Sequence, residues 1–188
     1  DNDAYEIRAL QNDGIGTNFG LELTIEKSFS KNYYALLTGS FYNSIYQGSD
    51  KVWRNTRYNG NYITSLTAGK DFRVGKKGKH VVGINIKFFY AGGRRITPIN
   101  LEASIAEGTE IRYENRQFED RVADYLRLDA RVRFKHNLKK VSWEVSLDVQ
   151  NVTNHKNEAK RSYNPASESI IYKYQQGIIP VLKFRVEF

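Results

Sequence analysis

The chain has 188 residues and a net charge of +8, with 29 Lys and Arg against 21 Asp and Glu. Because it contains no cysteine, thiolate metal sites, disulfides and cysteine nucleophiles are excluded. A mean hydropathy of −0.61, without any long apolar run, excludes a membrane-spanning helix.

Apolar and polar residues alternate along most of the chain, and this two-residue period predicts β-strands with one apolar and one polar face. The composition agrees, because 13 Tyr with only 3 Pro are typical of half-buried sheet. In chain order the predicted strands cover residues 18–28, 33–46, 60–72, 80–90, 126–135, 142–150 and 182–188. Only residues 100–108 offer a short helix. The sequence therefore predicts an all-β, antiparallel meander.

The predicted connections alternate between short and long. Short, basic turns fall near residues 30–32, 75–79 and 137–140, and longer polar stretches fall near residues 47–58, 93–122 and 154–169. Short turns at one end of the strands and long loops at the other are typical of an outer-membrane barrel. In such a barrel the apolar residues face lipid and the polar residues face the lumen.

Residues near the predicted strand ends suit the two membrane interfaces. The candidates for aromatic girdles are Tyr33, Tyr34, Phe72, Tyr90, Tyr125 and Phe134. The lysines of the short turns would meet anionic head groups or water, and they are Lys76, Lys77, Lys79, Lys139 and Lys140. A soluble lipocalin-like barrel or a sandwich shows the same alternation, so periodicity alone leaves that alternative open.

The last residues carry apolar side chains at every second position, Leu182, Phe184, Val186 and Phe188, and resemble the C-terminal signature of outer-membrane barrel proteins. Residues 125–129 (Tyr-Leu-Arg-Leu-Asp) and 147–154 (Leu-Asp-Val-Gln-Asn-Val-Thr-Asn) resemble the end of a TonB-dependent transporter barrel. Residues 52–61, 91–99 and 174–180 are similar to the Bacteroidetes branch of that family. Together these segments extend the resemblance over nearly the whole chain.

The resemblance implies that residues 1–188 are the C-terminal part of an antiparallel up-and-down transmembrane β-barrel, about the last seven of 22 strands. The plug domain and signal peptide of the family are absent from this sequence, so we expect them upstream. Seven strands are too few to close such a barrel, so we expect two unpaired edges. A periplasmic C-terminus, as in the family, would place the three long loops outside the cell.

The function that the resemblance implies is TonB-energised uptake of a scarce nutrient across the bacterial outer membrane. The nutrient would be siderophore-iron, cobalamin or an oligomeric nutrient. The expected partners are outer-membrane lipid, the plug domain of the same protein, TonB through the missing N-terminal region, and the small nutrient ligand.

Two sets of residues are candidates for the site of such a transporter. Aromatic and polar loop residues are the expected substrate contacts, namely Trp53, Arg54, Tyr58, Arg94, Arg95, Tyr113, Arg116 and Tyr163. Charged strand residues are expected to face the lumen, pair across strands and touch the plug, namely Arg127, Asp129, Arg131, Arg133, Glu144 and Asp148.

The sequence carries no catalytic motif, metal-ligand spacing or phosphate-binding loop, so it predicts no enzyme, cofactor or metal site. His80, His136 and His155 lie at or near predicted strand ends, where we expect them to face water. The loop at 93–122 is either a solvated acidic loop or a site for cations or a hydroxylated ligand, through Glu102, Glu107, Glu110, Glu114, Glu119 and Asp120.

The alternative function is that of a soluble basic β-barrel that binds a ligand or single-stranded nucleic acid, since a charge of +8 comes with many aromatic rings. However, the cations of residues 127–135 alternate with apolar residues and are accompanied by Glu144 and Asp148 on the next strand. That pattern favours ion pairs, so we expect no nucleic-acid partner. A requirement for detergent would distinguish the membrane protein from the soluble barrel.

Overall fold

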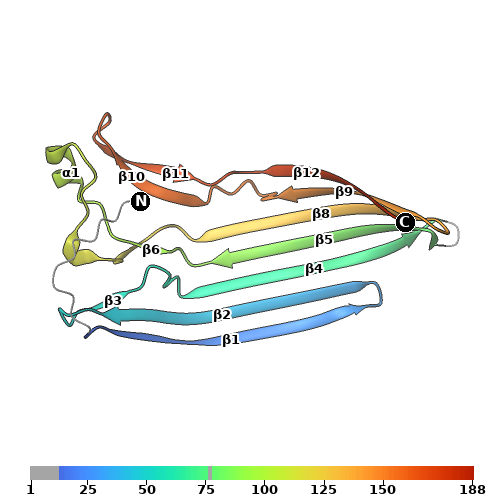
Figure 1. Cartoon of the computed structure of the whole chain (residues 1–188), viewed down its shortest axis with the longest axis horizontal. Coiled ribbons are helices and arrows are strands. Elements are labelled where there is room, and N and C mark those ends of the chain that lie inside the picture. Colours follow the sequence, from blue (N-terminus) through green and yellow to red (C-terminus); the bar gives the residue numbers. More distant parts are fainter. Residues whose placement is uncertain (1–12, 76–77) are drawn as a thin grey trace.

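Seven long antiparallel strands form one sheet in which neighbours along the chain are neighbours in space (Figure 1). The computed structural model describes residues 13–75 and 78–188. Across the sheet the strands are β1 (Ile15–Ser30), β2 (Tyr33–Gln47), β4 (Tyr62–Val74), β5 (His80–Ala91), β8 (Tyr125–Asn137), β9 (Ser142–Gln150) and β12 (Ile179–Glu187), and the short β3 (Trp53–Asn55) pairs with β2. The all-β prediction and its seven strands are confirmed.

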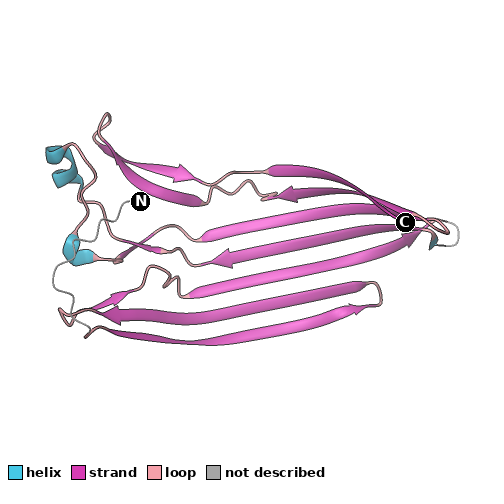
Figure 2. Ribbon diagram, in the orientation of Figure 1, coloured by secondary structure: helices cyan, strands magenta, loops and turns pink. Residues whose placement is uncertain are grey.

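The two ends of the sheet carry connections of different length. Short turns join β1 to β2, β4 to β5 and β8 to β9 at one end, on the right in Figure 1. At the other end lie β6 (Arg95–Ile96), α1 (Leu101–Glu107), the 3-10 helix η2 (Glu114–Arg116), β7 (Asp120–Arg121), β10 (Glu158–Asn164) and β11 (Ser169–Tyr174) (Figure 2). The predicted division into a turn end and a loop end is correct. Lys76 and Lys77 of the second turn lie outside the described residues.

The short helix α1 is the one predicted at residues 100–108, and the sequence fixes both of its ends. The Asn100 side chain accepts a hydrogen bond from the backbone N–H of Ala103 (3.1 Å) and caps the first turn. Gly108 ends the helix with a φ of 66°, a left-handed conformation that glycine adopts without strain. The buried Ser104 hydroxyl donates to the Asn100 carbonyl and accepts from the Ile111 N–H, which ties the helix to the returning chain.

The strand register gathers the apolar side chains on one face of the sheet, which we call the apolar face. Ile84 of β5 is paired with Val132 of β8, and Leu147 of β9 is paired with Leu182 of β12. Because side chains alternate between faces, one such pair fixes the side on which every second residue of both strands lies. These side chains are poorly covered: Leu182 is 74% exposed, and Leu21 of β1 is 73% exposed.

The exposed apolar face gives the molecule an unusually large surface. The accessible area is 13356 Å², whereas a compact folded monomer of 21.8 kDa exposes about 9,300 Å². Val122 and Tyr163 are the only buried apolar side chains among residues 13–75 and 78–188, so the sheet has no hydrophobic core of its own there. The sheet is open, with β1 and β12 at its edges, as expected for seven strands.

Rings gather at both ends of the apolar face. At the loop end, Tyr62 and Tyr90 stack with centroids 5.5 Å apart. At the turn end, His80 and His136 stack on each other at 4.4 Å, and Trp143 lies 5.6 Å from His136. The two imidazole Nδ1 atoms are 2.8 Å apart, so these histidines, which we expected to face water, instead hydrogen-bond to each other.

The girdle prediction is wrong for two of its six residues. Tyr34 neighbours Tyr33 in the chain and therefore lies on the opposite, polar face, where its hydroxyl accepts a hydrogen bond from the side-chain amide of Asn85 (2.9 Å). Tyr125 also lies on the polar face, where its ring meets that of Phe89. Alternation assigns two adjacent aromatic residues to opposite faces, and Tyr33 shares the parity of the apolar Ala35 and Leu37, so Tyr34 lies on the polar face.

Two glycines allow polar side chains to reach across an intervening strand. Gly83 of β5 lies between Asp71 of β4 and Arg133 of β8, and the Arg133 guanidinium passes over it to donate to the Asp71 carboxylate (2.7 and 2.8 Å). Gly69 of β4 lies in the same way beneath the hydrogen bond between Tyr34 and Asn85. A Cβ at Gly83 would lie 2.7 Å from Arg133 Cγ, so this crossing needs glycine.

Replacing Gly83 by alanine is expected to destabilise the protein. The new methyl group displaces Arg133 from Asp71, and we expect a loss of about 1–3 kcal/mol in the free energy of unfolding. The measurement is the urea midpoint of unfolding. Gly39→Ala is the matched control, because nothing lies within 4 Å of the Cβ added there. Equal midpoints for the two variants would contradict the role assigned to Gly83.

Candidate functional site

The polar face of the sheet carries a network of ion pairs that runs across the strands. Arg131 of β8 lies 2.9 Å from Glu144 and 3.2 Å from Asp148, both on β9. Arg133 lies 3.0 Å from the same Glu144 and also reaches Asp71. The six strand residues expected to face a lumen all lie on this face and all take part in ion pairs: Arg127, Asp129, Arg131, Arg133, Glu144 and Asp148.

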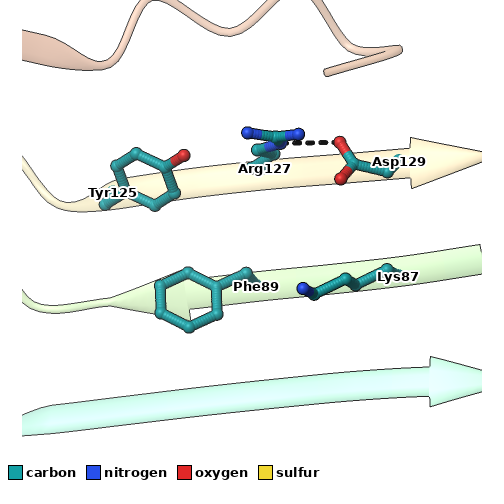
Figure 3. Close-up of a pocket in the computed structure, with 5 residues that line it drawn as sticks. All are labelled: Lys87, Phe89, Tyr125, Arg127 and Asp129. Carbon is teal, nitrogen blue, oxygen red and sulfur yellow. Dashed lines mark hydrogen bonds and ion pairs between the residues drawn. The ribbon is translucent and has the colours of Figure 1, made fainter. Parts of the chain in front are cut away.

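A hollow of about 240 Å³ lies on this face near the loop end, lined by Lys87 and Phe89 of β5 and by Tyr125, Arg127 and Asp129 of β8. Figure 3 shows the lysine side chain extended toward the phenylalanine ring, and the arginine joined to the aspartate. The Phe89 and Tyr125 rings meet edge to face with centroids 5.6 Å apart. The hollow therefore combines two cations, one carboxylate and two rings.

The charged side chains of this hollow differ in whether they have hydrogen-bond partners in the protein. The Arg127 Nε donates to Asp129 (2.7 Å), and the Arg127 Nη2 donates to the Gln150 side chain (2.9 Å). Asp129 also accepts the backbone N–H of Asn151 (2.8 Å). In the part of the chain that the structure describes, the Lys87 ammonium makes no hydrogen bond and no ion pair; Asp129 acts on it only through its charge.

The side chain of Asn157 hydrogen-bonds to the end of β8 that lines the hollow. The ladder between β8 and β9 begins only at Ala130, so the first residues of β8 lack that neighbour. Asn157 replaces it: its side chain accepts from the backbone N–H of Leu126 (2.9 Å) and donates to the Leu126 carbonyl (2.8 Å). This is the double hydrogen bond of an antiparallel pair, made by an amide side chain. Tyr125 and Arg127 are therefore held on both sides of Leu126.

The two longest loops are joined to each other above the sheet. Arg161 of β10 lies 2.6 Å from Glu158 and 2.7 Å from Asp120 of β7. Arg112 lies 2.6 Å from Glu110, whose second oxygen accepts the backbone N–H of Tyr163 (3.0 Å). Glu119 pairs with Arg116 in the same loop. Half of the acidic residues expected there as a cation or ligand site, Glu110, Glu119 and Asp120, are thus neutralised by arginines.

The eight expected substrate contacts all lie at the loop end, but most are engaged within the protein. Arg54 pairs with Asp50, Arg94 and Arg95 donate to the backbone carbonyls of Ala159 and Asn59, Tyr113 lies 5.0 Å beneath Arg116, which pairs with Glu119, and Tyr163 is buried. Trp53 and Tyr58 are different, since they are 48% and 73% exposed. These two rings are the members of the set that the structure leaves open to a ligand.

Sequence reasoning missed three residues of the hollow: Lys87, Phe89 and Tyr125. The register brings them together, because Lys87 is paired with Asp129, and Phe89 is paired with Arg127. The signal in the sequence was alternation: within each strand the lining residues are two apart, so they share the polar face. This alternation identifies the polar face, but it does not show which residues of β5 and β8 lie side by side.

Asp124 anchors the loop end to the sheet. Its carboxylate accepts hydrogen bonds from the hydroxyls of Tyr62 and Tyr90 (2.9 Å for Tyr90) and from the backbone N–H of Gly93 (3.1 Å). Partial burial raises the pKa of Asp124, but these hydrogen bonds outweigh that effect and hold its pKa below the usual 3.8. Charged Asp124 therefore stabilises the folded state above pH 3.8, and this stabilisation is lost as the pH falls through the lower folded pKa.

Replacing Asp124 by asparagine is expected to cost about 1–3 kcal/mol at pH 7, because hydrogen bonds to a charged acceptor are lost. The urea midpoint of the variant should fall less between pH 7 and pH 3 than that of the unaltered protein. Glu22→Gln is the control, because within the described residues Glu22 makes no hydrogen bond or ion pair. If both variants respond to pH alike, the anchor role of Asp124 is refuted.

Comparisons with known proteins and two searches of the structure complete this description. Within residues 13–75 and 78–188, no group of three or more His, Asp or Glu residues is placed to hold a metal ion. In the same part of the chain, none of the helices has the length and apolar character needed to cross a membrane. No protein-family model, no curated protein and no solved structure matches the chain.

Proposed function

We propose that this chain is the C-terminal part of the barrel wall of a TonB-dependent transporter in a bacterial outer membrane. The observation that carries the proposal is the apolar face, which is seven strands wide, uncovered by protein in the described residues, and bordered by rings at both ends. Water is a poor solvent for such a face, whereas the acyl chains of a bilayer match it.

The dimensions of the apolar face support the proposal. The 12-residue β5 places His80 in the belt at the turn end and Tyr90 in the belt at the loop end. A tilted strand needs about 9–11 residues to cross a bilayer, which matches the distance between the two belts. The longer β1 and β2, with 16 and 15 residues, would project beyond the membrane.

The alternative of a soluble basic barrel is less well supported by the arrangement of charges and layers. A soluble barrel or sandwich buries its apolar face, whereas Leu21 and Leu182 are largely exposed here. The cations that suggested nucleic-acid binding are engaged as well, since Arg131 and Arg133 pair with acids on neighbouring strands. We therefore propose outer-membrane lipid, an upstream plug domain, TonB and a small nutrient as the partners, and we propose no catalytic activity.

The location is tested by expressing the complete reading frame that contains this chain and fractionating the cell envelope. We expect the protein in the outer membrane, resistant to extraction with carbonate and released only by detergent. Several hundred residues upstream, including a plug and a signal peptide, are also expected. A protein that is soluble without detergent would refute the proposed location.

Neighbouring residues of β4 provide a matched pair for testing which face meets lipid. Leu66 lies on the apolar face and Thr67 on the polar face. In lipid vesicles, Leu66→Arg is expected to cost about 2–4 kcal/mol of unfolding free energy, because an arginine near the bilayer midplane is poorly solvated. Thr67→Arg is expected to cost less than about 1 kcal/mol. The measurement is the urea midpoint of the two variants in vesicles, and the reverse order would contradict the assignment of faces.

The transport function is tested at the two exposed loop rings. Replacing Trp53 and Tyr58 together by alanine is expected to lower uptake of the nutrient at least tenfold, because the rings offer exposed stacking surface at the loop end. Insertion into the outer membrane should stay unchanged. Arg116→Gln is the control, since Arg116 is engaged by Glu119 in the same loop region. Unchanged uptake in the double variant would exclude these rings from substrate binding.

A further inference from the structure

We propose that the hollow lined by Lys87, Phe89, Tyr125, Arg127 and Asp129 binds a carboxylate group carried on an aromatic ring. This inference rests on the proposed function, because the polar face is open to a solute where it lines a lumen. It adds a site on the strands, below the loops, and a chemical class for the group that occupies it.

The first reason is that the Lys87 ammonium makes no hydrogen bond and no ion pair in the described residues. Its neighbour across the strands, Asp129, already accepts the Arg127 Nε at 2.7 Å and the Asn151 N–H at 2.8 Å. Other cations on the same face are paired, for example Lys135 with Glu187 at 2.7 Å. An anion in the hollow would give the Lys87 ammonium the partner that the described residues do not supply.

The second reason is the spare donor capacity of Arg127. A guanidinium carries five N–H groups in a planar fork. Arg127 uses its Nε–H on Asp129 and an Nη2 N–H on Gln150, and the Tyr125 hydroxyl is a further hydrogen-bond partner. At least two of its five N–H groups stay available to a ligand. A carboxylate suits such a fork, because its two oxygens accept side by side.

The third reason is the shape and lining of the hollow. Its volume of about 240 Å³ equals that of roughly eight molecules of liquid water, enough for one ring with a carboxylate. The edge-to-face pair of Phe89 and Tyr125 forms one wall and offers a ring face to a second aromatic group. Charge at one side and rings at the other therefore select an aromatic carboxylate over a small inorganic anion.

The proposed occupant is a free aromatic carboxylate, and the rival occupant is an acidic side chain elsewhere in the full-length protein. The two occupants are distinguished on the full-length protein in detergent, through the reactivity of the Lys87 amine. Acetylation by an amine-reactive ester is followed by mass spectrometry with and without benzoate, with acetate and inorganic phosphate for comparison. In parallel, a water-soluble carbodiimide couples Lys87 to any carboxylate in contact with it.

For a solute site, saturating benzoate should slow acetylation of Lys87 about tenfold, and phosphate should have little effect. Lys139, in the turn between β8 and β9, serves as the internal control and should react at the same rate throughout. Acetylation that benzoate does not slow overturns the proposal. A carbodiimide link from Lys87 to an Asp or Glu outside this chain overturns it as well, because neither side chain carries a ring.

A variant pair gives an independent measurement of binding. Lys87→Gln is expected to raise the Kd for benzoate about tenfold, because a charge-assisted hydrogen bond is lost. Arg73→Gln removes the same charge from the polar face of β4, away from the hollow, and should leave the Kd unchanged. Equal Kd values for both variants overturn this inference while the protein remains in the outer membrane. A protein that is soluble without detergent would overturn the proposed function instead.

Discussion

The structure depends on one constraint, the strict alternation of side chains kept in register across seven antiparallel strands. Pairing Ile84 with Val132 and Leu147 with Leu182 places most apolar positions on the same side, and every ion pair of the network on the other. No second layer covers the apolar side in the described residues, so the sheet needs an apolar solvent or a partner. The proposed place in a lipid bilayer supplies the solvent, and the rings of Tyr90 and His80 then lie where the acyl chains meet the head groups.

The loop end is held together by different interactions. It has little apolar burial, and only Val122 and Tyr163 among the described apolar side chains are withdrawn from solvent there. Its order comes from polar side chains that take the place of missing strand neighbours: Asn157 completes the ladder beside Leu126, and Asp124 gathers two tyrosine hydroxyls and a backbone N–H. Arginines add ion pairs at the same end, such as those of Arg161 with Glu158 and Asp120, so the basic composition of the chain is partly structural.

Much of the architecture could be predicted from the sequence, because a two-residue period and loop lengths are local properties. The seven strands, the short helix α1 and the division into turn end and loop end all follow from such local signals. The candidate site was less accessible. Whether Lys87 lies beside Asp129 depends on register between strands, which no local pattern encodes. The loop arginines were expected to touch substrate because loops carry function, yet Arg94 and Arg95 donate to backbone carbonyls.

The glycine beneath the Arg133 side chain has a consequence for how the sheet finds its pairing. A slip of β5 by two residues keeps every apolar side chain on the correct face, so solvent alone cannot discriminate against it. It would, however, replace Gly83 between Asp71 and Arg133 by Val81 or Asn85, whose side chains would obstruct the crossing. Gly69 imposes the same condition between β2 and β5. Gly69 and Gly83 thus disfavour misregistered sheets that would still keep the apolar side chains on one face.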